Sequence, residues 1–251
     1  MSLNCNEINV ILDELDLTGA FIQQIVQPGY DSLALYCYKN GKATTLLISL
    51  APGVCRLHET NRKVPKNDKP LRFMEFLKSR IKGCRINSVE QMGFERIIKM
   101  ELGNSSERFY MFIRLWSAAS NIIVTDSDYY ILDVFFRRPK KDEVSGALFS
   151  LPEIDNSATL EEKLEKYPVR TFDDLENASE LSFNQKVEKF YSEHAATLSR
   201  EAMLEQAVLV DSGPVAVRYP RGGEGRFRED SSPKSIVRLK EGADVTLVGY
   251  G

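Results

Sequence analysis

The residues whose chemistry stands out are basic, and they lie close together in the first half of the chain. Between positions 56 and 99 there are twelve Lys and Arg residues against five Asp and Glu residues. Such a cluster can bind the phosphate backbone of a nucleic acid, because each cation that neutralises a phosphate releases a counterion. A plainer interpretation is that Arg62, Lys63, Lys66 and Lys69 keep an exposed loop soluble.

Side chains that could catalyse a reaction or bind a metal are scarce. The chain has two histidines, His58 and His194, and no Ser or Cys nucleophile motif accompanies His58. Its four cysteines form no Cys-x-x-Cys pair, so we expect reduced thiols and no zinc site. Acidic pairs such as Glu161-Glu162 fit the first turns of helices, where carboxylates complement the helix dipole. The sequence predicts no catalytic residue, no metal and no cofactor.

Length and composition indicate a folded protein. The chain has 251 residues, enough for one large domain or two small ones, and 43% are hydrophobic and 27% charged, as in average globular domains. No apolar run approaches eighteen residues, and the first residues lack the basic and apolar segments of a signal peptide. We therefore expect a cytoplasmic protein that does not contact a membrane.

Helices and short β-strands alternate over the first 138 residues. Asn4 and Glu7 have the spacing of a capping box, which predicts a helix over 5–17. The segment 58–70 is polar and predicts a loop, and the periodicity of 71–81 predicts a second helix. Residues of β-forming type occupy 20–27, 32–38, 44–50, 85–91, 95–102, 108–116, 120–125 and 129–136. We expect residues 1–138 to form one α+β domain built on antiparallel sheets.

The chain changes character after residue 138. Residues 139–181 resemble a linker with short helices, and 182–207 predicts a long helix that leaves the domain as an arm, because no Gly or Pro interrupts it. Between 142 and 206 there are six basic and fifteen acidic residues, as expected for solvated helices. Residues 208–251 end in a β-like run, 243–251, for which we expect no strand partner.

Six short blocks resemble the N-terminal domain of the NFACT family, in the family's order and spacing. The blocks are GAFIQQIVQPGYDSLALYCYKNGKATTLLIS (19–49), CRLHET (55–60), FMEFLKSRIKGCRI (73–86), QMGFERII (91–98), SNIIVTD (120–126) and YILDV (130–134). The family includes RqcH-type ribosome quality-control factors and proteins labelled fibronectin-binding protein A. The resemblance implies an antiparallel β-sandwich with helices, like the N-terminal domain of formamidopyrimidine-DNA glycosylases, followed by the helical arm and a short fragmentary α/β-type tail.

The resemblance also implies nucleic-acid-binding residues. Glu95-Arg96 takes the place of the family's Asp-Arg pair, which is implicated in handling tRNA, and Arg56 and His58 match its Arg-x-His block. Asn121 keeps the position after the family's Gly-Arg-His, which is replaced here by 117–119 (Ser-Ala-Ala). This replacement implies weaker RNA binding than in complete family members.

A further basic block of the family is conserved in charge only. Its Leu-Arg-Lys-His appears here as 77–80 (Leu-Lys-Ser-Arg), so Lys78 and Arg80 keep basic charge without the same geometry. Together these departures suggest a reduced paralogue.

Residues 207–251 resemble a fragment of 1-deoxy-D-xylulose-5-phosphate synthase, through SGPVAVRYPRGGEG and ADVTLVGYG. The thiamine-diphosphate motifs of that enzyme have no counterpart in the chain.

Three functions remain open. The first is an RNA-binding module that contacts tRNA or the stalled large ribosomal subunit, with 182–207 reaching a coiled-coil partner. The second is the synthase, and the third is a fibronectin- or fibrinogen-binding adhesin, which the missing secretion signal disfavours.

Overall fold

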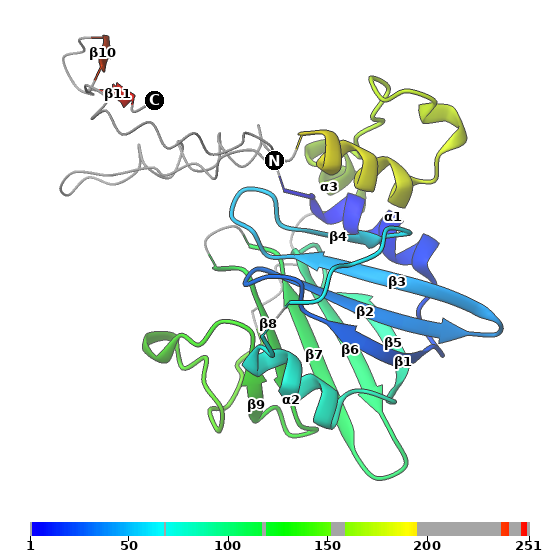
Figure 1. Ribbon diagram of the computed structural model, residues 1–251. Helices are drawn as coiled ribbons and strands as arrows, with labels where there is room; N and C mark the ends of the chain where they lie inside the picture. Colours follow the sequence, from blue (N-terminus) through cyan, green and yellow to red (C-terminus); the bar gives the residue numbers. More distant parts are fainter. Residues whose placement is uncertain are drawn as a thin grey trace. The chain divides into compact units, whose positions relative to one another are not determined.

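The computed structural model describes residues 2–67, 69–116, 119–151, 159–194, 237–240 and 247–249. The chain divides into two compact units, Met1–Arg218 and Tyr219–Gly251. The first unit is a large β-sheet with helices packed against it (Figure 1). The helices are α1 (Cys5–Leu15), α2 (Arg72–Arg80), α3 (Leu160–Lys166) and a further helix over 183–194.

One antiparallel sheet of nine strands forms the framework, in the order β4-β3-β2-β1-β5-β6-β7-β8-β9. The strands are β1 (Phe21–Val26), β2 (Ser32–Lys39), β3 (Lys42–Ser49), β4 (Arg56–Glu59), β5 (Arg85–Gln91), β6 (Ile97–Gly103), β7 (Arg108–Arg114), β8 (Asn121–Thr125) and β9 (Ile131–Val134). The pair Phe21↔Arg85 is the register contact between β1 and β5. This narrow seam separates the half formed by β1–β4 from the half formed by β5–β9.

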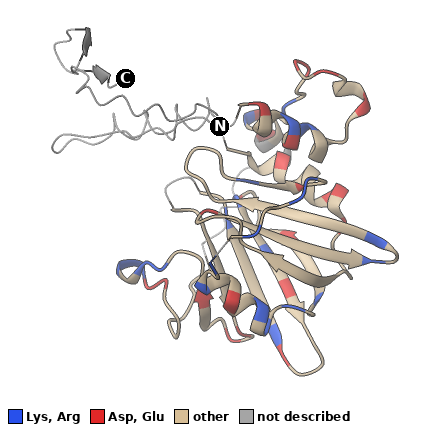
Figure 2. Cartoon of the chain, in the orientation of Figure 1, with Lys and Arg blue, Asp and Glu red and all other residues tan. Residues whose placement is uncertain are grey.

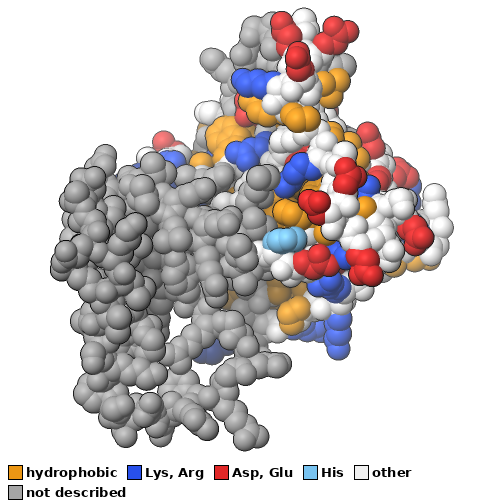
Figure 3. All heavy atoms as spheres, turned by 90° about the horizontal axis from the view of Figure 1, so that it is seen from above, with side chains coloured by type: hydrophobic (Ala, Val, Ile, Leu, Met, Phe, Trp, Pro, Cys, Tyr) orange, Lys and Arg blue, Asp and Glu red, His pale blue; other side chains and the backbone are white. Residues whose placement is uncertain are grey.

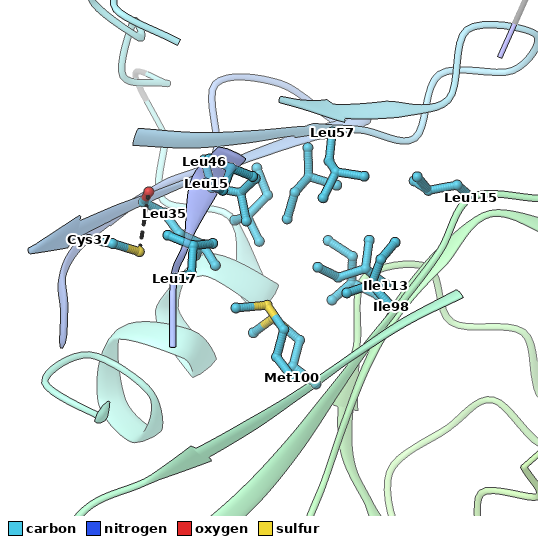
Figure 4. Packing of buried hydrophobic residues seen from close by; sticks show 14 of the residues in the cluster. Leu15, Leu17, Leu35, Cys37, Leu46, Leu57, Ile98, Met100, Ile113 and Leu115 are labelled. Carbon is cyan, nitrogen blue, oxygen red and sulfur yellow. Dashed lines mark hydrogen bonds between the residues drawn. The ribbon is translucent and has the colours of Figure 1, made fainter. Parts of the chain in front are cut away.

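The hydrophobic core lies between the two halves of the sheet. Leu35 and Leu46 from the first half face Ile98, Met100 and Ile113 from the second half (Figure 4), and all five are almost completely buried. α1 contacts β4 and β5, while α2 contacts β1 and β9. The prediction of a mostly antiparallel sheet with a few helices is confirmed, whereas the detailed likeness to the glycosylases stays a prediction.

Local sequence signals position the first helix and the first hairpin as expected. The Asn4 side chain accepts from the Glu7 backbone N–H at 3.0 Å, and the Glu7 carboxylate accepts from the Asn4 N–H at 2.9 Å. α1 ends earlier than predicted because Asp16 takes the left-handed conformation, with φ 42°. Between β2 and β3, Asn40 and Gly41 have φ values of 48° and 85°, as a tight hairpin turn requires.

β4 lies partly inside the segment that the sequence predicts as a loop, so that prediction is wrong for residues 58 and 59. β4 pairs with β3 in the register Ser49↔Arg56 and Leu47↔His58. Leu57 points into the core, whereas Arg56 and His58 lie on the other face of the sheet. Pairing with β3 therefore outweighs the polar composition of this short strand.

The helix over 183–194 packs on the domain, which differs from an arm that leaves it. Val187 is completely buried and Tyr191 is 2% exposed, and both belong to the main core cluster. Asn184 donates to the Ile11 carbonyl at 3.3 Å and to the Glu14 carboxylate at 2.7 Å. Residues 195–207 of the expected arm lie outside the described residues.

Contacts also cross the domain boundary that the sequence suggests at residue 138. Arg170, in the expected linker, forms an ion pair with the buried Glu7 at 2.5 Å. Residues 173–177 form turns that lead into a short 3₁₀ helix, Ala178–Glu180. Figure 3 views this end of the first unit from above and shows acidic side chains interspersed with basic ones.

The second unit contains an antiparallel pair, β10 (Val237–Lys240) with β11 (Leu247–Gly249). The expectation that the terminal β-like run has no partner is therefore wrong, because the basic run before it supplies one. The resemblance of this tail to the synthase stays a prediction.

Candidate nucleic-acid interface

The candidate residues do not form one site. They lie in four places: the turn between β5 and β6 (Glu95, Arg96), the outer face of β4 (Arg56, His58), the start of β8 (Asn121) and α2 (Lys78, Arg80). Each place has a different electrostatic environment, so each is considered from its own contacts.

Glu95 and Arg96 form a half-buried turn held by its backbone. The Glu95 N–H donates to the Met92 carbonyl at 3.0 Å, and the Leu115 N–H donates to the Arg96 carbonyl at 2.8 Å. Gln91 donates from its amide to the Glu95 carbonyl at 2.8 Å. Within the described part of the chain, neither the Glu95 carboxylate nor the Arg96 guanidinium makes a hydrogen bond or an ion pair. The backbone therefore fixes the turn and leaves both charged groups available.

The charge of Arg96 acts on two thiols, those of Cys5 and Cys55. Burial raises the pKa of Cys5, at the start of α1, and of Cys55, just before β4, and the positive charge of Arg96 partly opposes both shifts. The turn is therefore close to the N-terminal end of α1 and to the beginning of β4. The Arg56 charge also lowers the pKa of Cys55, whereas the Glu95 charge raises that of Cys5, so charges of both signs act at this place.

His58 is neutral near pH 7 and cannot act as a cation for phosphate. It is 2% exposed, and its Nδ1 donates to the Glu59 carbonyl at 2.8 Å. Burial is the main cause that lowers the pKa of His58 to about 4; the hydrogen bond to Glu59 opposes this shift, and the nearby Arg56 and Arg62 charges add to it. His58 lines a cleft on the outer face of β4, which Arg56 and Tyr191 also line. Because its imidazole is uncharged, it cannot form an ion pair with a phosphate there.

Arg56 lies in the same cleft, beneath the helix over 183–194. Its guanidinium stacks on the Tyr191 ring with its carbon 4.6 Å from the ring centroid, and Nη1 donates to the Val54 carbonyl at 3.1 Å. Burial lowers the pKa of Arg56 below its usual range, although Tyr191 and Asp31 oppose this shift. The cleft has a volume of about 490 Å³. Arg56 can therefore contact a small group that enters the cleft. The helix over 183–194 covers Arg56 and blocks contact with an extended RNA.

Asn121 is part of the interior. Its Nδ2 donates to the Phe136 carbonyl at 2.9 Å and to Glu143 Oε2 at 2.7 Å, and its Oδ1 accepts from the N–H groups of Ile122 and Phe136 at 3.0 and 2.8 Å. Glu143 also pairs with Arg114. All hydrogen-bonding groups of the Asn121 side chain are thus used within the protein, and a structural role accounts for its position.

Lys78 and Arg80 lie in the last turn of α2, which has one acidic residue, Glu75, in its first turn (Figure 2). Lys78 pairs with Glu75 at 3.1 Å and Arg80 with Glu107 at 2.7 Å. Glu107 follows β6 and Arg96 precedes it, so about 20 Å of strand separates the two places. A single small ligand therefore cannot contact both the Glu95-Arg96 turn and the Lys78 and Arg80 side chains.

The sequence did not single out two serines that line the cleft, Ser32 and Ser49. The sequence does predict that these two serines are paired, because the two-residue turn at Asn40-Gly41 fixes the register of the hairpin.

Within the described residues, no group of three or more His, Cys, Asp or Glu side chains could hold a metal ion. No helix of that part of the chain is long and apolar enough to cross a membrane.

Comparison with known proteins identifies the family. The family model described as NFACT N-terminal and middle domains matches residues 7–153, more than half of the chain. The chain belongs to the NFACT family. Mouse NEMF, a ribosome quality control complex subunit, is 33% identical to this NFACT chain over 121 residues, which are 48% of the chain and 11% of NEMF. RqcH of Streptococcus pneumoniae, an Rqc2 homolog, is 30% identical over 142 residues, covering 53% of the chain and 26% of RqcH.

Solved structures show the same fold. The N-terminal domain of the fibronectin-binding protein PavA from Streptococcus pneumoniae has a TM-score of 0.57 at 22% identity, covering 77% of this NFACT chain and 82% of that domain. The N-terminal part of the fibronectin/fibrinogen-binding protein from Streptococcus suis has a TM-score of 0.58 at 18% identity, covering 75% and 84%. The chain therefore shares the fold of these domains but spans only a part of the length of NEMF and RqcH.

Proposed function

We propose that this NFACT chain binds RNA in ribosome-associated quality control, with tRNA or the stalled large ribosomal subunit as its partner. The observation that carries this proposal is the Glu95-Arg96 turn, whose backbone is fixed while both charged groups lack a hydrogen bond or ion pair within the described residues. Relatives of the chain include ribosome quality control proteins, and a ribosomal partner implies a cytoplasmic location.

The two charged groups have different expected roles. Arg96 attracts phosphate, whereas the Glu95 carboxylate repels it and is useful only as an acceptor for a ribose hydroxyl, a base edge or Arg96. Lys78 and Arg80, which are exposed at the other end of β6, fit a secondary contact along an extended RNA. A coiled-coil partner for 182–207 stays a prediction, and the buried face of 183–194 is already occupied by its own domain.

A salt-dependent filter-binding assay tests the proposal. tRNA should bind the full chain at low salt and only weakly at physiological salt, with a log–log slope of about −0.7 per phosphate contact on single strands. Arg96→Ala should weaken binding and make the slope less steep by about 0.7. Lys42→Ala is the control, because Lys42 is an exposed cation on β3, outside the 56–99 basic cluster, for which the described residues provide no ion pair.

The outcomes separate RNA binding from the other functions. Affinity that does not depend on salt, or an Arg96→Ala chain that binds like the parent, would remove the basis for the proposal. Immobilised fibronectin in the same series tests the adhesin function, since two neighbours in fold carry fibronectin-binding names.

A further inference from the structure

Three polar side chains form a row across the floor of the Arg56 cleft. Ser32 on β2 pairs with Ser49 on β3, and Ser49 pairs with Arg56 on β4. Directly paired residues lie on the same face of a sheet, about 4.8 Å apart from strand to strand. Ser32, Ser49 and Arg56 therefore occupy neighbouring positions on one face of the sheet, and all three residues line the cleft.

These groups have hydrogen-bonding capacity that the protein does not use. Ser49 is only 6% exposed, yet within the described residues its hydroxyl has no hydrogen-bond partner. Nε of Arg56 is buried without a partner as well. Buried polar groups are nearly always hydrogen-bonded, so the unpartnered Nε of Arg56 beside the cleft indicates a missing acceptor.

The walls of the cleft define the size and character of what can enter. Val54, Val64 and the Tyr191 ring offer apolar and aromatic surface, and Arg62 and Lys63 stand at the rim. A volume of about 490 Å³ is within the range for small-molecule sites, about 300–1,000 Å³.

The acidic residues of the cleft do not cancel its attraction for anions. Glu188 is engaged by the Thr60 hydroxyl and by Arg62, whose Nε lies 3.9 Å from its carboxylate. Asp31 is exposed and faces Arg56, which makes it the one lining carboxylate for which the described residues provide no hydrogen bond or ion pair. The cleft therefore has a basic floor and rim with one opposing charge.

We propose that this cleft binds a phosphomonoester, with Ser32, Ser49 and Arg56 holding the phosphate and the Tyr191 wall contacting the attached organic group. A guanidinium and two hydroxyls supply the charge-assisted hydrogen bonds that a phosphate requires. Two sources share this chemistry: a free mononucleotide and the 5′-phosphate of an RNA. The proposal goes beyond RNA binding at the Glu95-Arg96 turn, because none of the residues that hold the phosphate belongs to that turn.

Calorimetric titration of the full chain tests the site with adenosine 5′-monophosphate, inorganic phosphate and adenosine. We expect the monophosphate to bind more tightly than either part alone. Ser49→Ala should weaken its binding about tenfold, about 1.4 kcal/mol, and Ser88→Ala, a matched strand serine on β5, should not. Asp31→Asn should tighten binding several-fold, because it removes the opposing charge. Neither substitution removes an atom of the Arg56–Tyr191 stack.

A pair of short RNAs that differ only in a 5′-phosphate or 5′-hydroxyl identifies the source. Preference for the phosphorylated RNA assigns an RNA end, and monophosphate binding without that preference assigns a free nucleotide; either result supports the cleft. Equal binding of adenosine and the monophosphate, or unchanged binding in both Ser49→Ala and Asp31→Asn, would overturn the proposal. Arg96→Ala separates the two sites, since it should reduce tRNA binding and leave monophosphate binding unchanged.

Discussion

Removing Arg170 should destabilise the domain strongly, because it leaves a buried carboxylate unpaired. Glu7 is completely buried, and its carboxylate accepts from Arg170 Nε at 2.5 Å, from Nη2 at 2.9 Å and from the Arg170 backbone N–H at 3.2 Å. Only the backbone contact and the Asn4 N–H remain in Arg170→Ala. Breaking a buried pair from one side costs about 3–5 kcal/mol.

The expected loss is measured by urea unfolding, with a surface pair as the control. Arg80 and Glu107 are both more than two-fifths exposed, so Arg80→Ala should cost at most about 1 kcal/mol. In thermal unfolding, Arg170→Ala should lower the midpoint temperature by roughly 10 °C for a domain of this size. Adding Glu7→Gln to Arg170→Ala should recover part of the loss, because it removes the stranded charge. Equal costs for Arg170→Ala and Arg80→Ala would refute the argument that the expected linker is integral to the domain.

Two other predictions concern the cleft and the helix that covers it. The pKa of His58 is lowered from 6.5 to about 4, so the unfolded chain binds a proton that the folded chain does not. The free energy of unfolding is therefore unaffected by His58 above about pH 6.5 and falls by about 3 kcal/mol as the pH falls toward 4. Urea unfolding across this pH range should show a weaker pH dependence of stability in His58→Leu. An unchanged pH dependence would contradict the assignment to His58. Asn184→Ala should cost about 2–3 kcal/mol, because it leaves the Glu59 N–H, now 2.8 Å from Asn184 Oδ1, without its acceptor. Hydrogen exchange at Glu59 should become faster in this variant but not in Glu193→Ala, and equal protection in both variants would show that the helix is not held by this contact.

Much of the fold follows from signals that are local in sequence. The capping box of α1 and the Asn40-Gly41 turn each involve residues at most three positions apart, so their patterns contain the information that forms them. β4 was missed in part because a four-residue strand with Arg, His and Glu resembles a loop until its pairing with β3 is known.

The candidate site was less predictable, because its environment comes from distant segments. The family pattern places Asn121 beside functional residues, but only the folded chain shows that Glu143 and Phe136 use its amide completely. Arg56 is covered by Tyr191, which is far away in sequence, and the acidic composition around that helix favoured a solvated arm. The Glu95-Arg96 turn also differs from the sequence-based expectation: the β-forming run 95–102 predicts a strand there, whereas β6 begins only at Ile97, and Leu115 on the segment after β7 helps to hold the turn.

The contacts between α1 and the later helix set an order of events during synthesis. Asn184, the partner of Glu14, is synthesised 170 residues after it, and Arg170, the partner of Glu7, is synthesised 163 residues after it. At about 5–20 residues per second, a ribosome needs roughly 10–30 seconds to make that stretch. Throughout this interval the nascent first helix lacks both Arg170 and the helix over 183–194, although the nine strands of the sheet, residues 21–134, are completed before Arg170 is added. A chain released early, before residue 170, would therefore be left with an exposed apolar surface and an unpaired carboxylate, and it would be a target for chaperones and proteases.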